Sequence, residues 1–176
     1  MTTFSNPANA AAGAAAGYVK AILDILGDRD PLTVMSELVP WVTGRVRGLD
    51  DAVLRRPEAP GKWSVMEVVQ HLADTELVYG YRTRMILSQD TPPIAGYDQD
   101  VWVRTFHYRE LPLAEALAQL SALRATNLRL LRSLDAAQWK RAGLHSERGM
   151  ESVKRIVQMI GGHDLVHRRQ IDRILG

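Results

Sequence analysis

Two histidines near the end of the chain, His163 and His167, are four residues apart. On a helix this spacing puts both side chains on one face, about one turn from each other. A single helix uses the same spacing to offer two imidazoles to one metal ion. At 100° per residue the pair shares a stripe with Ile156, Ile160 and Ile174, where a bundle helix normally carries Leu or Ile. Because inward-facing imidazoles need partners, the pair predicts a metal site, which requires at least a third ligand.

Composition limits what else the chain can be. Its 176 residues are 46% hydrophobic and 24% charged, as in a soluble single-domain protein. It has no apolar run near 18 residues and no recognisable signal peptide, so we expect a cytoplasmic protein. Since the chain has no cysteine, any metal must be held by His, Asp or Glu. The net charge of +2 is too small to indicate nucleic acid as a partner.

The elements that must position these histidines are helices. We expect an N-terminal extension over 1–29, disordered or loosely docked over 1–17 with a short helix over 18–26, followed by a bundle domain over 30–176. Asp30 and Pro31 mark the start of the first bundle helix, and Pro40 is expected to kink or divide it. The other long helices are expected to run to about Ser88, to follow Pro112, and to span about 151–175. The pattern shows no convincing strand and predicts an all-α four-helix bundle.

The clearest helix start is at Ser64. Ser64 and Glu67 form a capping-box pattern, and Trp63 precedes it as a hydrophobic staple. His71 follows one turn later, on the flank of the apolar stripe, where a histidine would be able to act as a ligand. From this flank we expect the metal to lie towards an open side of the bundle.

Residues 89–110 form a long connection between the second and third helices, which predicts a lid, a crossover or a hidden helix. His107 in this connection and His145 in a predicted loop over 143–149 lack ligand-like spacing. We expect both to face the solvent, with His107 as a possible lid residue. The aromatics of the connection are expected to anchor it to the bundle.

The motifs Trp63-Ser64-x-x-Glu67-x-x-x-His71-Leu72-x-Asp74 and His163-x-x-x-His167-x-x-Gln170 resemble the DinB/YfiT-like superfamily. The resemblance covers about residues 31–175. It implies a bacterial four-helix-bundle metalloprotein in which His71, His163 and His167 bind a divalent ion, nickel or zinc. It also implies a homodimer and a small-molecule substrate. Members of the family include thiol S-transferases and candidate metal-dependent hydrolases.

Three neutral imidazoles leave a metal with open coordination positions, which is the catalytic pattern. The metal would activate water for a hydrolase, or a low-molecular-weight thiol for an S-transferase, and the sequence does not choose between them. Glu67, Asp74 and Gln170 are candidate partners of the ligands, although the capping box already explains Glu67. Two alternatives remain: a non-catalytic stress-related bundle that binds metal or a partner protein, and histidines satisfied by hydrogen bonds alone.

Overall fold

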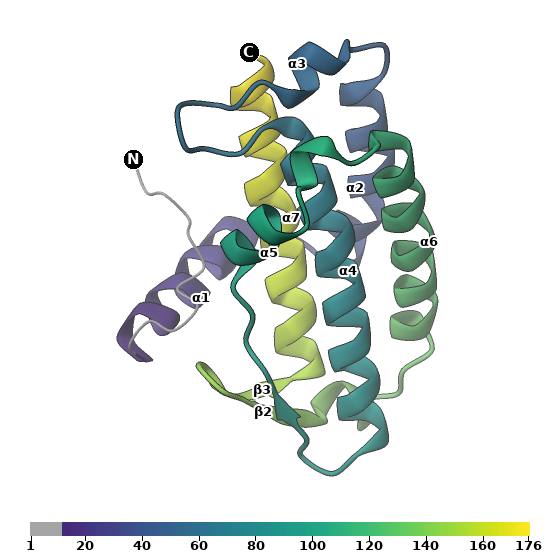
Figure 1. Ribbon diagram of the computed structural model, residues 1–176. Helices are drawn as coiled ribbons and strands as arrows, with labels where there is room; N and C mark the ends of the chain where they lie inside the picture. The colour runs from purple at the N-terminus through teal and green to yellow at the C-terminus, as the bar shows by residue number, and fades with distance from the viewer. Residues whose placement is uncertain (1–11) are drawn as a thin grey trace.

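The computed structural model describes residues 12–176, with side chains from residue 15 onward. Four long helices form the body of the fold: α2 (Pro31–Val46), α4 (Val65–Ser88), α6 (Leu113–Arg132) and α7 (Val153–Leu175). Both α2 and α4 pack against α6 and against α7, which closes the bundle (Figure 1). The predicted four-helix bundle is therefore confirmed. No helix in the described part of the chain is long and apolar enough to cross a membrane.

Local signals explain where the two marked helices begin. At α2, the Asp30 side chain accepts a hydrogen bond from the Thr33 amide at 2.9 Å, as an N-cap does. At α4, the Ser64 amide donates to Glu67 Oε2 at 2.7 Å and the Glu67 amide donates to Ser64 Oγ at 3.4 Å. This reciprocal pair is the predicted capping box.

Pro40 was expected to kink or divide α2; division is wrong, because α2 is one helix from Pro31 to Val46. A proline deprives one carbonyl, four residues earlier, of its helical partner. Pro40 and Ser36 are both exposed, so water can satisfy that carbonyl.

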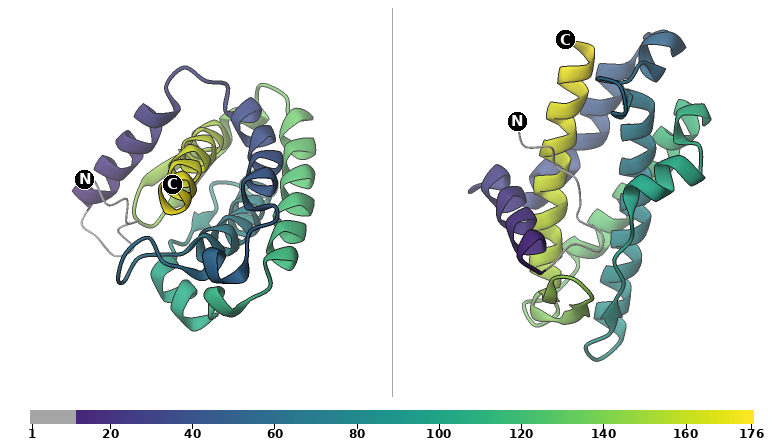
Figure 2. Two further views of the ribbon diagram at one scale, coloured as in Figure 1. Left: turned by 90° about the horizontal axis from the view of Figure 1, so that it is seen from above. Right: turned by 60° about the vertical axis from the view of Figure 1, so that its left-hand side comes forward.

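An additional helix, α1 (Ala12–Leu26), is longer than the predicted short helix and packs across the outside of α7 (Figure 2). Residues 12–17 are therefore helical, and the predicted tail is wrong for them; residues 1–11 lie outside the described residues. Two glycines of α7 permit the close approach of α1. A Cβ on Gly162 would lie 2.4 Å from the Ile22 carbonyl oxygen, and one on Gly161 would lie 3.2 Å from Leu26 Cδ1.

The long connections contain short elements. A short helix, α3 (Asp51–Arg55), follows α2. The 89–112 connection contains β1 (Pro93–Ile94), α5 (Gln99–Thr105) and a 3₁₀ turn, η1 (Tyr108–Glu110), so the hidden helix is confirmed. Tyr108 is buried and its hydroxyl donates a hydrogen bond to Asp74, which anchors the connection to α4.

The structure contains a small sheet where the sequence predicted none. After a 3₁₀ turn, η2 (Gln138–Lys140), strands β2 (Ala142–His145) and β3 (Gly149–Ser152) pair antiparallel, and β1 pairs parallel to β2. Gly149 turns the chain with φ +73°, a backbone conformation that favours glycine. Because each strand has at most four residues, the hydrophobic pattern carried no period-two signal. The hairpin takes the place of the predicted 143–149 loop. As a result, α7 begins at Val153 and not at about residue 151.

The apolar interior is divided into two clusters by a layer of buried polar residues. One cluster includes Leu38, Ala73 and Leu120, and the other includes Met35, Tyr79 and Leu128. Glu76 and Arg124, which lie between them along α4 and α6, and Asp164 on α7 are all buried. The histidines of α4 and α7 belong to the same middle part of the bundle, as the next section describes.

Candidate metal centre

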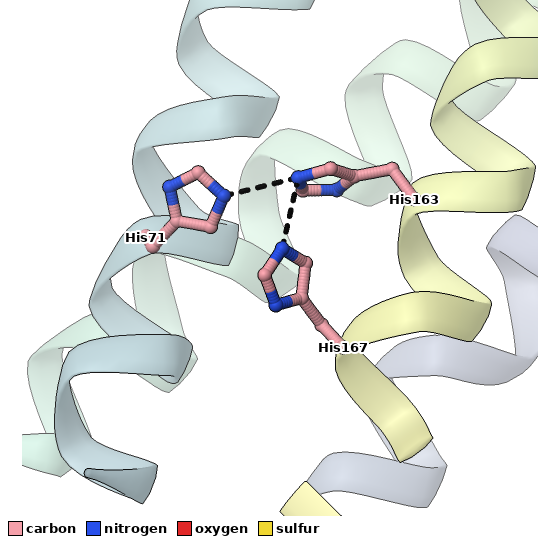
Figure 3. Close-up of side chains that lie close together, drawn as sticks. All are labelled: His71, His163 and His167. Atoms are coloured by element: carbon pink, nitrogen blue, oxygen red, sulfur yellow. Dashed lines mark hydrogen bonds between the residues drawn. The ribbon is translucent and has the colours of Figure 1, made fainter. Parts of the chain in front are cut away.

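Three imidazoles meet between α4 and α7 (Figure 3). His71 comes from α4, and His163 and His167 come from successive turns of α7. Nε2 of His163 lies 3.0 Å from Nε2 of His71 and 3.0 Å from Nε2 of His167. The structure therefore brings together the three residues that the sequence selected.

The centre is enclosed. The exposed fractions are 2% for His71, 6% for His163 and 7% for His167. The prediction that the flanking position of His71 leaves an open side is therefore wrong: residues on both flanks of α4 are buried near His71 by the neighbouring helices and connections. Burial lowers the pKa of His71 and of His163 well below the usual value and that of His167 to about 4. The rings are therefore neutral at neutral pH, which is the form that binds a metal.

Gln170 and Trp63 fix the orientation of His167. His167 Nδ1 lies 2.8 Å from Gln170 Oε1. Since an amide oxygen only accepts, Nδ1 carries the proton, and Nε2 presents its lone pair to the other two rings. The Trp63 ring stacks on the His167 ring with an interplanar angle of 7° and a centroid distance of 6.2 Å. Gln170 thus contacts a ring of the cluster, which was one of the interactions considered for it.

The donor set fits a divalent ion. Two nitrogens bound about 2.0–2.1 Å from one tetrahedral ion lie about 3.3 Å apart, and the two short Nε2 separations here are 3.0 Å. A neutral ring has one proton, so three converging Nε2 atoms cannot all be satisfied by hydrogen bonds to each other. Among the described residues the cluster contains no carboxylate and no fourth histidine. The protein side chains thus leave room in the coordination sphere for a small molecule.

The other two candidate partners have structural roles. Glu67 closes the capping box and also pairs with Arg109 at 3.0 Å. Asp74 accepts hydrogen bonds from Tyr108 and, at 3.0 Å, from Gln119 Nε2. No hydrogen bond joins Asp74 to a ring of the centre in the described structure.

A buried ionic network lies directly beside the centre. Arg124 Nη2 lies 3.0 Å from Asp164 Oδ1 and 3.0 Å from Glu76 Oε1. Asp164 follows His163 in α7, and burial raises its pKa to about 6. The network holds this turn of α7 against α4 and α6, and so positions His163.

Sequence reasoning missed several residues around the centre. Thr75 Oγ1 lies 3.4 Å from His71 Nε2 and 3.4 Å from the Tyr97 hydroxyl, which joins the centre to the 89–98 connection. Thr75 is four residues after His71, so helical spacing could have found it. Tyr97 could not have been found in this way, because its position depends on the path of the connection.

The two histidines that were expected to face the solvent, His107 and His145, differ in their exposure. His107 is exposed, as predicted. His145 is 2% exposed, so that prediction is wrong. His145 is the last residue of β2, between β1 and β3, and the missed sheet explains the error.

A helical bundle with three convergent buried imidazoles belongs to the class of bundles that build cofactor sites between facing helices. The profile of the DinB superfamily matches residues 42–171, and the chain belongs to that superfamily.

Known proteins support the same assignment. The solved structure of YfiT from Bacillus subtilis matches with a TM-score of 0.74 and 26% identity, covering 81% of this chain and 84% of that one. It is described as a probable metal-dependent hydrolase with an unusual four-helix bundle topology. The YfiT sequence of strain 168 is 27% identical over 149 residues, 82% of this chain and 84% of YfiT. A relative from Geobacillus thermodenitrificans is 33% identical over 110 residues, 62% of each chain. Both relatives are named as candidate metal-dependent hydrolases.

Proposed function

We propose that the protein is a metal-dependent hydrolase that holds one divalent ion, zinc or nickel, through His71, His163 and His167. The observation that carries this proposal is the convergence of three neutral, buried Nε2 atoms with no fourth ligand among the described residues. The names of the relatives from Bacillus subtilis and Geobacillus thermodenitrificans support the hydrolase class.

A bound ion of this kind acts as a Lewis acid, polarising a carbonyl or lowering the pKa of a water or thiol. The chain's own residues supply the rest. Gln170 holds His167 in the tautomer that presents Nε2. Thr75, at 3.4 Å from His71 Nε2, offers a hydroxyl that can orient a small molecule at the centre. Trp63 and the neighbouring helices exclude bulk water, which strengthens electrostatic interactions inside the site.

A second version of the same chemistry is transfer of a low-molecular-weight thiol. Because the chain has no cysteine, the thiol nucleophile of this reaction would arrive as a co-substrate. The two reactions differ in which nucleophile the metal activates, so one set of assays separates them.

The first test is elemental analysis of untagged protein, because a polyhistidine tag binds the same metals. We expect about one zinc or nickel ion per chain in the wild type and its loss in His163→Ala. His107→Ala is the matched control, because it removes an exposed histidine and should keep the metal. Absence of metal after incubation with zinc and with nickel would overturn the proposal.

The second test is activity of the metal-loaded wild type on ester and amide substrates and on thiol transfer. Hydrolysis that disappears in His163→Ala supports the hydrolase, and transfer that requires an added thiol supports the S-transferase. If a metal-loaded protein has neither activity, the non-catalytic bundle is the better description. Light scattering would test the homodimer, which stays a prediction.

A further inference from the structure

A second site is suggested by a small cavity next to His163. It has a volume of about 10 Å³, and it lies where α1, α4, the 89–98 connection and the β2–β3 hairpin meet. His163 lines it, together with Arg82, His145, Tyr97 and Tyr18. The cavity is therefore adjacent to the candidate metal centre through a shared side chain.

Arg82 is a buried cation that forms no ion pair among the described residues; the buried Glu151 acts on its charge only from a distance and is itself paired with Arg148. Arg82 is 6% exposed, and its guanidinium donates to the Ala95 carbonyl. Among the described side chains no carboxylate forms an ion pair with Arg82. The nearby Arg148 engages Glu151 at 2.6 and 2.8 Å.

The charge of Arg82 is only partly stabilised by its aromatic neighbours. The guanidinium lies 5.4 Å from the Tyr79 ring centre and 5.7 Å from that of Tyr97. Such contacts are worth about 0.5–2 kcal/mol. A buried charge generally requires a paired opposite charge as well, and an anion in the cavity would provide one.

Two of the residues that line this cavity, His145 and His163, each have a buried ring nitrogen without a hydrogen-bond partner among the described residues. His145 Nδ1 accepts a hydrogen bond from the Glu147 amide at 3.1 Å, so its Nε2 carries the proton. That Nε2 is buried and has no hydrogen-bond partner among the described residues. His163 Nδ1 is likewise buried and unpartnered among them, and it carries a proton when Nε2 serves as a metal ligand.

We propose that this cavity binds the carboxylate group of a small-molecule substrate through Arg82 and the ring N–H groups of His145 and His163. All three protein groups are donors, and a carboxylate only accepts. A guanidinium also matches the planar, two-oxygen geometry of a carboxylate. The inference rests on the proposed function, because it identifies the substrate class of that same site.

The size of the cavity limits the ligand. A volume of about 10 Å³ corresponds to roughly one water-sized group. A carboxylate therefore enters only if Tyr18 of α1 or Tyr97 of the connection moves outward, and a bulkier phosphate requires a larger movement.

The shared residue links the two sites. A carboxylate that accepts a proton from His163 Nδ1 makes the ring a better metal ligand, as an outer carboxylate does in many metal sites. Each ligand should then increase the affinity of the protein for the other by the same factor.

The test titrates sodium acetate into metal-free protein at constant ionic strength, with sodium chloride as the reference anion. Side-chain nitrogen NMR of ¹⁵N-labelled protein reports on His145 and His163. We expect saturable shifts with acetate in the wild type, and binding weaker by about tenfold to a hundredfold in Arg82→Gln. Arg169→Gln removes an exposed arginine of α7 and should bind acetate like the wild type.

A further variant keeps the test decisive if circular dichroism shows that Arg82→Gln does not fold. His145→Phe should bind acetate more weakly than the wild type. Absence of saturation in the wild type, equal shifts with chloride, or unchanged binding in the folded variants would overturn the inference.

Zinc affinity, measured with a competing indicator with and without acetate, separates this inference from the proposed function. Normal zinc binding without an acetate site overturns only the carboxylate site. An acetate site in a protein that binds no zinc overturns only the metal-dependent function.

Discussion

Arg124 offers a sharp test of how the polar layer supports the fold. Arg124 is 3% exposed. Its guanidinium donates to the Met35 carbonyl at 2.8 Å and lies 3.0 Å from oxygens of both Asp164 and Glu76. Arg124→Met keeps an unbranched side chain but leaves two buried carboxylates without a cation. Breaking a buried ion pair in this way costs about 3–5 kcal/mol. For a chain of this length that corresponds to a fall in Tm of about 6–20 °C.

Urea denaturation of the metal-free protein measures this loss without a contribution from bound metal. Arg129→Met is the matched control, because Arg129 is exposed on the same helix and its replacement should change stability by less than about 0.5 kcal/mol. A loss below about 1 kcal/mol for Arg124→Met would refute the reasoning. Adding Glu76→Leu and Asp164→Leu to Arg124→Met should recover much of the stability, since an apolar layer can replace a buried ionic one. Failure to recover would mean that shape rather than charge determines the cost.

Three other outcomes are expected. Gly162→Ala should lower stability by about 1–3 kcal/mol in urea denaturation, because the added Cβ would lie 2.4 Å from the Ile22 carbonyl oxygen. Gly44→Ala is its control: nothing lies within 4 Å of the added Cβ, so stability should rise by about 0.5–1 kcal/mol; equal effects would contradict the packing of α1 on α7. Burial lowers the pKa of His145 from 6.5 to about 4, so the unfolded chain binds the extra proton first and stability should fall as pH drops from 6.5 towards 4. His145→Gln should flatten that dependence and His107→Gln should not, as measured by the unfolding free energy across this range. Loading the protein with zinc should raise Tm, and removing the zinc with EDTA should lower it again; an unchanged Tm would contradict zinc binding to the native state.

The helices and two of the three candidate ligands were predictable because their signals are local. The capping box of Ser64 and Glu67 involves residues three apart, and the pair His163 and His167 lies on one helical face. For the third ligand, His71, no local rule was sufficient. Its selection depended on the resemblance to a known family, and the structure confirms that it lies beside the other two.

The features that sequence reasoning missed depend on residues far apart in the chain. Arg124 on an amphipathic helix was indistinguishable from a surface arginine until α4 and α7 brought carboxylates to it. The burial of His145 follows from pairing between β1 and β2, whose residues are about 50 positions apart. Arg82 lies on the same face of α4 as His71, and it is buried by α1, the hairpin and the 89–98 connection, which are distant from it in the sequence. In each case the contacts of the residue depend on tertiary packing, which the hydrophobic periodicity of its own helix or strand does not reveal.

The packing of α1 against α7 has a consequence for biosynthesis. Ile22 and Leu26 of α1 pack against Gly161 and Gly162 of α7. The ribosome makes α7 after all the other helices described here. At a translation rate of about 5–20 residues per second, the apolar side of α1 stays uncovered for several seconds or more before α7 has been synthesised. Two of the three imidazoles are made in the same final segment, so a nascent chain can neither dock its first helix nor assemble the centre. We therefore expect chaperones to engage the nascent α1 and metal to load only after translation.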